Sequence, residues 1–566
     1  MLNSFSLAKS LSSASNADYW FFSLPPPGTV FPFMEIIEMQ GVEFTHAPGE
    51  GAGKPAKALD NVSLCINRGD FVAILGSKGS GKSTLARLLN ALYLPTAGRV
   101  RIHGIDSCDA SRLWEIRRLT GMVFADTANQ IVGTTVEEDV AFGPENLGLP
   151  AAEILLRVES ALQAVGLMDF AGRAPHTLSA EEQQRLALAG ILAMQSECII
   201  LDEATTRLDP AGRQEIMRLL RRLNRELGLT ILHITRHRDE AVLADRVLVL
   251  ESGQIVLDGT PAEVFADDAR LAALGLAEPL PLRPPKQDGA AIDSQKAWSY
   301  PLVMMGGYAP GDSLLHRTDA RSKILLALLF MVLLYSVESY GALFLLCAFM
   351  LLLTLGIGRS LSDSWRGLRP ILWLAACAAF FNIFFVSGAP LATSGILSYL
   401  SYEGLHRSAK MMLRLILLVS SATLLTATTS PLALTSGLES LLQPLKRIKI
   451  PVQQLAMLFA LALRFIPVIV EEAAKSIQAR ASRSPAFHIG GLRQRLQGYI
   501  PLLFPLFVAI FRRGEALATA MEARCYRGDL QRTRMRPLQF SSADLFSSAV
   551  LLVLLTVLFF VEVKVV

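Results

Sequence analysis

The chain has 566 residues, of which 51% are hydrophobic and 18% charged, and its net charge is +4. This length and hydrophobic content argue against one compact soluble domain and favour two or more units. The charge is too balanced for a general nucleic-acid binder, and the aromatic residues do not alternate with basic clusters, so no nucleic-acid partner is expected. The six cysteines are scattered without a C-x-x-C pair, which predicts a reducing compartment and no structural metal.

The first half has the composition of a soluble domain. Residues 1–33 are rich in Ser and Pro and are predicted to be a disordered extension. Residues 34–280 alternate β-rich stretches such as DFVAILG with helical patterns such as STLARLLNALY, which predicts an α/β domain. Residues 281–316 contain many Pro, Gly and Ala residues and are predicted to be a linker.

Residues 317–566 are predicted to form an all-α transmembrane domain with about five spans. The apolar runs lie near 324–337, 341–357, 370–387, 408–429 and 545–562. Several are short, because about 18 residues are just enough to cross the hydrocarbon core, and their polar flanks are expected to extend the shorter ones. Basic residues before the first run and after the second and fourth place those loops in the cytoplasm, whereas Arg407, Lys410 and Arg414 conflict with this topology. The basic, periodic stretch 430–540 predicts long amphipathic helices on the cytoplasmic face.

A phosphate-binding loop is predicted between the apolar strand FVAIL and a helical run. The segment GSKGSGKST matches G-x-x-x-x-G-K-[ST]. Its glycines let backbone N–H groups turn toward a polyphosphate, Lys82 neutralises the β and γ phosphates, and the Ser83 hydroxyl helps to hold Mg²⁺. The predicted ATP-binding residues here are Gly76, Ser77, Gly79, Ser80, Gly81, Lys82, Ser83 and Thr84.

Two adjacent carboxylates follow a second apolar strand, CIIL, about 120 residues later. Asp202 is suited to binding Mg²⁺, and Glu203 is suited to act as a base that orients the attacking water. Together with Lys82 they form the predicted catalytic set.

These blocks resemble an ATP-binding cassette (ABC) ATPase. The segment LSAEEQQR, which begins at Leu178, lies at the place of the family's LSGGQ signature, and Thr206-Arg207-Leu208-Asp209 resembles its D-loop. The fold implied is an α/β P-loop NTPase. In this family two cassettes close around two nucleotides, and each site combines one chain's P-loop with the other chain's signature.

The chain departs from the family pattern at three functional places. In the signature, Ala180, Glu181 and Glu182 replace two glycines and a glutamine, and the added carboxylates should repel phosphate. Ala125 replaces the glutamine of the Q-loop, and Gln130 belongs to the following helical segment.

Arg236 aligns with the family's switch histidine, and His237 comes one residue late. Either a one-residue shift of the loop restores His237, or the switch is lost. His46, where the family usually has an adenine-stacking aromatic residue, either stacks on adenine or is an ordinary surface histidine.

The second half resembles the T component of energy-coupling factor (ECF) transporters over roughly residues 317–530. The similarity begins at RTDARSK, continues in LRFIP with Glu471 and Glu472, and is most specific at Ser482-Arg483-Ser484 and Ala523-Arg524-Cys525. In that family two such arginines end coupling helices, and each helix docks on one cassette. Ser484 and Cys525 replace glycines, so where each helix ends is open.

Arg483 and Arg524 are therefore the predicted coupling residues. The acidic cluster Glu137-Glu138-Asp139 is a candidate acceptor for one of them, and a solvated helix start is the alternative. Four further arginines, Arg480, Arg527, Arg532 and Arg534, are expected at an anionic membrane face.

The sequence thus predicts an ATPase subunit fused to the membrane scaffold of an ECF importer in the cell membrane, with its cassette in the cytoplasm. The resemblance implies ATP and Mg²⁺, a second ABC ATPase subunit as a heterodimer partner, and a separate substrate-binding S component that carries a vitamin or transition-metal ion. The alternative is a catalytically degenerate ATP-binding scaffold that pairs with an active ATPase.

Overall fold

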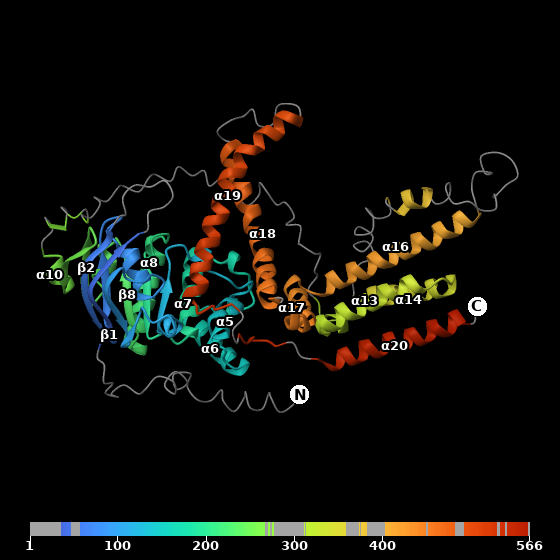
Figure 1. Ribbon diagram of the computed structural model, residues 1–566, viewed down its shortest axis with the longest axis horizontal. Coiled ribbons are helices and arrows are strands. Elements are labelled where there is room, and N and C mark those ends of the chain that lie inside the picture. Colours follow the sequence, from blue (N-terminus) through green and yellow to red (C-terminus); the bar gives the residue numbers. More distant parts are fainter. Residues whose placement is uncertain are drawn as a thin grey trace. The chain divides into compact units, whose positions relative to one another are not determined.

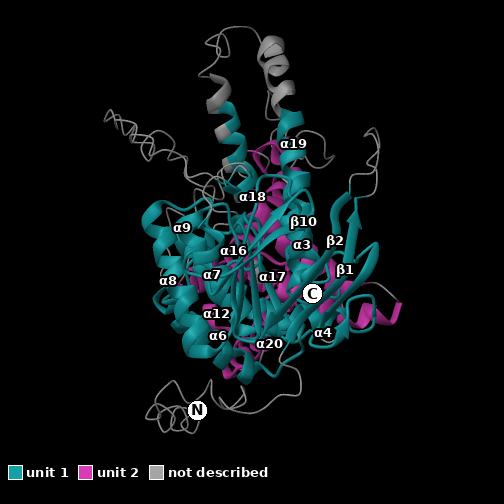
Figure 2. Ribbon diagram, turned by 90° about the vertical axis from the view of Figure 1, so that its left-hand side faces the viewer, with its two compact units in different colours: residues 1–285, 468–536 teal, residues 286–467, 537–566 magenta. Residues whose placement is uncertain are grey.

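The computed structural model describes residues 35–46, 57–266, 270–271, 274, 276, 311, 313–357, 373, 375–381, 402–448, 451–481, 492–528, 532–537 and 540–563. Two compact units make up the chain, one from residues 1–285 with 468–536 and one from 286–467 with 537–566 (Figure 2). The predicted extension 1–33 and most of the predicted linker 281–316 lie outside the described residues.

Two sheets form the centre of the first unit. An antiparallel sheet has the order β2-β1-β4-β5, from β1 (Glu35–Thr45), β2 (Lys57–Asn67), β4 (Ala97–Ile102) and β5 (Ile105–Asp106). A six-stranded sheet has the order β10-β9-β3-β8-β7-β6, from β3 (Phe71–Leu75), β6 (Thr120–Val123), β7 (Cys198–Asp202), β8 (Thr230–Ile234), β9 (Arg246–Glu251) and β10 (Gln254–Gly259). Only β10 runs antiparallel to its neighbour in this sheet.

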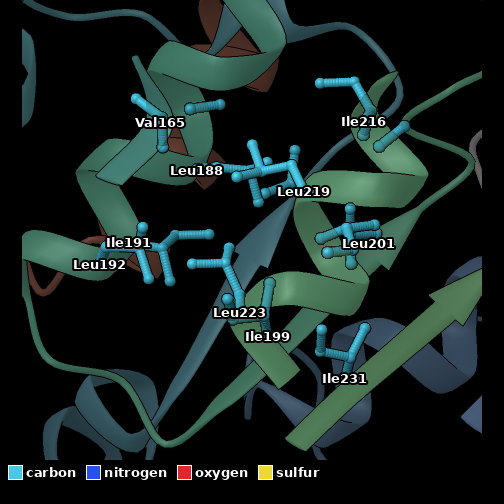
Figure 3. Packing of buried hydrophobic residues seen from close by; sticks show 14 of the residues in the cluster. Val165, Leu188, Ile191, Leu192, Ile199, Leu201, Ile216, Leu219, Leu223 and Ile231 are labelled. Carbon is cyan, nitrogen blue, oxygen red and sulfur yellow. The ribbon is translucent and has the colours of Figure 1, made fainter. Parts of the chain in front are cut away.

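Strands β3, β7 and β8 are buried along their whole length, because helices or the other sheet cover both faces. Side chains that point to one face, such as Ile199, Leu201 and Ile231, pack against the helices (Figure 3). Those that point to the other face, such as Ile200 and Leu232, pack against α3 and the antiparallel sheet. The predicted α/β domain is therefore confirmed, and the carboxyl ends of β3 and β7 meet at one edge.

The helices of this unit include the one that continues the phosphate-binding loop, those that cover the six-stranded sheet, and one from the C-terminal half. They are α3 (Lys82–Leu89), α4 (Leu113–Leu119), α5 (Val136–Asn146), α6 (Ala151–Val165), α7 (Ala180–Ala193), α8 (Pro210–Leu227), α9 (Arg238–Ala241), α10 (Pro261–Val264) and α19 (Leu492–Ala523). Short 3₁₀ turns are η1 (Thr127–Asn129), η2 (Met168–Phe170) and η3 (Pro175–Thr177). Helix α18 (Val452–Ala481) crosses the boundary between the units.

The second unit is helical. Its described helices are α12 (Leu314–Arg317), α13 (Ala320–Ser336), α14 (Tyr340–Gly356), α16 (Tyr402–Thr428), α17 (Pro431–Leu442), the turn η5 (Gln443–Ile448) and α20 (Ser542–Val563). Helices α13, α14, α16 and α20 lie side by side (Figure 1) and share an apolar cluster that includes Leu334, Leu346, Leu417 and Leu554.

Four of the five predicted spans coincide with α13, α14, α16 and α20, whereas the predicted span 370–387 lies mostly outside the described residues. Within the part of the chain that the structure describes, two helical stretches are long and apolar enough to cross a membrane, Glu403–Thr428 and Val452–Ala474, and Tyr340–Gly356 and Ser542–Leu558 are shorter apolar helices. The second stretch lies within the predicted coupling region 430–540 and is long and apolar enough to span a membrane, and the amphipathic, cytoplasmic character of that region stays a prediction.

Candidate nucleotide site and docking groove

The loop between β3 and α3 folds around the ammonium group of Lys82. Lys82 Nζ donates to the backbone oxygens of Gly76, at 2.8 Å, and Ser77, at 2.7 Å. Gly81 adopts a φ of 103°, and a Cβ there would lie 2.4 Å from Ala58 O, so this turn requires glycine. The sequence G-x-x-x-x-G-K-[ST] is thus held as a cradle, and the predicted residues from Gly76 to Thr84 lie together in it.

The hydroxyl and carboxylate predicted to bind Mg²⁺ are in direct contact. Ser83 Oγ donates to Asp202 Oδ1 at 2.8 Å, and Asp202 ends β7 beside the loop. A hydroxyl and a carboxylate oxygen are the hard ligands that Mg²⁺ prefers, so this pair fits the ion. Burial raises the pKa of Asp202, and burial lowers the pKa of Lys82 although Glu203 opposes this. Both shifts have burial as their main cause, which disfavours the charged form of each group.

Glu203 lies beside Lys82 but is paired with a different cation. Its Oε1 is 3.9 Å from Lys82 Nζ. Arg236 Nε donates to Oε1 at 2.9 Å, and Arg236 Nη2 donates to Oε2 at 2.7 Å. Glu203 has a φ of 50°, a left-handed conformation that a non-glycine residue rarely adopts outside functional sites.

Arg236, and not His237, is therefore the residue that faces Glu203. His237 is the N-cap of α9, and its backbone N–H donates to Thr235 Oγ1 at 3.1 Å. Of the two alternatives left open by the sequence, the structure agrees with a switch position occupied by arginine.

The altered Q-loop is connected to the D-loop. Arg207 Nη1 lies 2.7 Å from Asp126 Oδ1, next to Ala125. Gln130 is buried and caps the short turn η1, and it lies before α5 begins, so the expectation that it belongs to the following helical segment was wrong. The Asp126–Arg207 pair was not predicted, because the resemblance of Arg207 to a D-loop position does not indicate its partner.

Both added carboxylates of the signature take part in local interactions of α7. Ser179 caps the helix, and Glu182 Oε2 accepts a hydrogen bond from Ser179 N at 2.7 Å. Glu181 Oε1 lies 2.5 Å from Arg185 Nη2. The carboxylates still stand at the helix N-terminus, where the family signature has none, so repulsion of a partner's γ-phosphate stays a prediction.

His46 belongs to a small aromatic cluster beside α3. Its ring packs edge-on against Phe44, with centroids 5.0 Å apart, and Phe44 stacks on Tyr93 at 5.1 Å. Arg87 Nη1 donates to Tyr93 Oη at 2.7 Å, which fixes that ring. Sequence reasoning missed Tyr93, although an aromatic residue one helix after the phosphate loop was a usable signal.

A groove between α5 and α7 holds the arginine that follows α19. Arg524 Nη1 lies 3.1 Å from Asp139 Oδ2, and a Cβ on Gly190 would lie 3.3 Å from Arg524 Nη2. Asn146 Nδ2 donates to the backbone oxygen of Arg524 at 3.0 Å. The prediction that the acidic cluster accepts a coupling arginine is confirmed for Asp139.

The other two acids of the cluster have different partners. Glu138 accepts the backbone N–H of Thr135 in a capping box at the start of α5, as the alternative interpretation proposed. Glu137 pairs with Arg536, whose Nη2 lies 2.9 Å from Glu137 Oε2.

Cys525 ends α19 in a conformation typical of glycine. Its φ is 60°, and the N–H of Tyr526 donates to Met521 O at 3.0 Å. This left-handed residue terminates the helix directly after Arg524, so the replacement of glycine by cysteine does not prevent helix termination. Arg483, the other predicted coupling residue, lies outside the described residues.

The segment after α19, which we call the strap (residues 532–536), lies along α5. Arg532 Nη2 is 2.9 Å from Glu145 Oε2, and the guanidinium lies over the Phe142 ring. The Met535 side chain enters the hydrophobic core of this unit, and Met535 N donates to Glu145 Oε1 at 2.8 Å.

Two of the arginines expected at a membrane face have partners on the cassette. Arg532 binds α5, and Arg527, which is exposed, lies over the Trp114 ring with Cζ 4.3 Å from its centroid. These partners lie about 400 positions away in the sequence and were not predicted, and a membrane contact of the two arginines stays a prediction.

Comparison with known proteins agrees with this architecture. The ABC transporter family model matches residues 59–206, and the model described as cobalt transport protein, CbiQ, matches residues 311–535.

Among curated relatives, the energy-coupling factor transporter ATP-binding protein EcfA1 of Symbiobacterium thermophilum is 54% identical over 242 residues, which are 42% of this chain and 84% of the relative. EcfA1 of Clostridioides difficile is 50% identical over 244 residues, or 43% of this chain and 87% of the relative. The structure of cbiO1 from Clostridium perfringens, described as part of the ABC transporter complex cbiONQ, is 34% identical with a TM-score of 0.39, covering 43% of this chain and 96% of its own. The chain therefore belongs to the energy-coupling factor transporter ATP-binding proteins, as an ATP-binding energising component fused to a T component of the CbiQ type.

Proposed function

We propose that ATP binding and hydrolysis by this cassette move α19 through Arg524 and so drive uptake of a vitamin or transition-metal ion. The buried pair between Arg524 and Asp139 supports this most directly, because it fixes the end of a C-terminal helix to the cassette. Asp139 also accepts the backbone N–H groups of Val132 and Gly133, in the loop that follows the altered Q-loop. A movement of the Q-loop on nucleotide binding can therefore reach Asp139 and Arg524 through a few residues of the same chain.

The residues of the site fit the hydrolysis of ATP. Lys82 and the backbone N–H groups of the loop bind the phosphates, and Ser83 with Asp202 would hold Mg²⁺, which supplies charge neutralisation for the phosphates. Glu203 is the candidate that orients a water molecule toward the γ-phosphorus. The water oxygen forms a bond to that phosphorus while the bond to the β-phosphate oxygen breaks, and the products are ADP and phosphate.

The proposal includes a second cassette from a different chain, because the signature Ala180-Glu181-Glu182 is poorly suited to bind a partner's γ-phosphate. The chain is proposed to cross the cell membrane several times, with the cassette in the cytoplasm and a separate S component that binds the cargo.

A second candidate function is an ATP-binding scaffold with little hydrolysis of its own. The ion pair between Arg236 and Glu203 favours it, since the candidate base is engaged.

The experiment that tests these functions is ATP hydrolysis by the purified full-length chain, alone and with a co-expressed intact cassette. Hydrolysis by the chain alone that Glu203→Gln abolishes would mean that its own site drives transport. Activity that appears only with the partner and survives Glu203→Gln in this chain would mean that the site is a structural ATP clamp. Loss of ATP binding in Lys82→Ala is expected in both cases, and unchanged binding would contradict both.

A further inference from the structure

The carboxylate of Glu203 is held on both oxygens by one guanidinium group. The two Arg236 hydrogen bonds, at 2.9 Å and 2.7 Å, form a fork, and Lys82 Nζ lies 3.9 Å from the nearer oxygen. Bidentate, charge-assisted bonds of this kind are among the stronger and more directional hydrogen bonds in proteins. The fork occupies one acceptor site on each oxygen, so a water molecule can use only the remaining sites of a carboxylate whose direction Arg236 sets.

Arginine differs from histidine in this position for a chemical reason. The guanidinium group stays protonated at every accessible pH and has no acceptor lone pair, so it can only donate. The fork therefore fixes the orientation of the Glu203 carboxylate through both of its oxygens. The pair is nevertheless breakable, because the Arg236 side chain is 43% exposed whereas that of Glu203 is 14% exposed.

We propose that Arg236 is a positioning residue that slows hydrolysis by holding Glu203 away from the attacking water, while nucleotide binding is retained. The inference rests on the proposed hydrolytic function of this site. It assigns a slowing of hydrolysis to one removable contact at a site where Lys82, Ser83, Asp202 and Glu203 all remain in place.

The test uses the full-length chain in lipid nanodiscs, co-purified with a second cassette whose own catalytic glutamate has been replaced by glutamine. Hydrolysis then reports this chain's site. Arg236→Gln and Arg236→His are each expected to raise kcat by about tenfold or more, since a positioned base contributes roughly 100-fold or more. KM is expected to change less than about threefold, because phosphate binding by Lys82 is untouched.

Three controls separate positioning from a structural effect. Arg236→Lys keeps the charge without the fork and is expected to give a smaller increase in kcat. The double variant Arg236→Gln/Glu203→Gln is expected to lose the increase. Arg238→Gln, two residues later at the start of α9 and packed over the Phe265 ring, is expected to leave kcat unchanged.

An unchanged or lower kcat in both Arg236→Gln and Arg236→His, with thermal unfolding like that of the parent chain, would overturn the inference. A fluorescent ATP analogue measures binding separately. If the parent chain shows no binding that Lys82→Ala removes, the proposed function fails. If such binding is present and kcat does not rise, only the role of Arg236 fails.

Discussion

Arg524 and Asp139 are 385 positions apart in the sequence, and their side chains form an ion pair of 3.1 Å in which the exposed fractions are 6% and 0%. Asp139 does not depend on this partner alone, because it also accepts the N–H groups of Val132 and Gly133. Arg524 is therefore the better residue to change, since its removal leaves the buried carboxylate partly satisfied.

Arg524→Ala is expected to release the end of α19 from the cassette without unfolding the cassette. Removing one partner of a buried pair costs about 3 kcal/mol, which corresponds to a roughly 100-fold faster opening. Hydrogen exchange of residues 520–528 and of the start of α5 measures this. Arg512→Ala, at an exposed position of the same helix, is the matched control and should leave exchange unchanged. Slow exchange in Arg524→Ala would contradict the assigned contact.

Gly190→Val is expected to give a similar exchange pattern while Arg524 is still present. A Cβ at Gly190 would lie 3.3 Å from the guanidinium, and the two methyl groups of valine would occupy its place in the groove. Gly172→Ala is the control, because no atom lies within 4 Å of its added Cβ. Retained protection at 520–528 in Gly190→Val would show that the arginine does not need this groove.

The two salt bridges of the strap should differ in how much they stabilise its contact with α5. Arg532 covers the Phe142 ring and pairs with Glu145 in a half-buried place, whereas the Arg536 side chain is 71% exposed. Ion pairs between solvent-exposed side chains contribute little to stability. We expect Arg532→Ala to accelerate protease cleavage within 526–537 and Arg536→Ala to leave the cleavage rate close to that of the parent chain. Equal acceleration in both variants would contradict this ranking.

The stability of the cassette should depend on Glu240 at acid pH. Burial alone would raise the pKa of this carboxyl, but His233, with the Thr235 and Thr205 hydroxyls, lowers it to about 2 from an ordinary 4.5. A lowered pKa stabilises the folded state above pH 4.5, and this contribution, on the order of 3 kcal/mol, is lost as the pH falls from 4.5 toward 2.

Thermal unfolding of the full chain and of Glu240→Gln checks this dependence. The difference in Tm between the two is expected to be constant from pH 7 to 5 and to shrink below pH 4.5. A difference that grows as the pH falls would contradict the assigned direction.

The sequence predicted the parts of the site that lie close together in the chain or carry a fixed spacing. The loop around Lys82 and the carboxylates after β7 have such spacing, and so does the arginine that ends α19. The fork between Arg236 and Glu203 was not predicted, because an alignment of motifs shows a replaced residue but not its new partner. The strap was missed for a different reason, since Arg532 looked like any basic residue near a membrane until Glu145 and Phe142 were placed beside it.

The most direct test of the account is whether α19 follows the cassette when nucleotide binds. Spin labels at Glu226 in α8 and Glu515 in α19, both exposed, report the distance between the two helices in a chain whose exposed Cys108 and Cys377 are changed to serine. The account predicts a narrow distance distribution that is kept on addition of ATP and Mg²⁺ in the parent chain with its partner cassette, and a broad distribution in Arg524→Ala. The same narrow distribution in both proteins would contradict the claim that Arg524 transmits the motion.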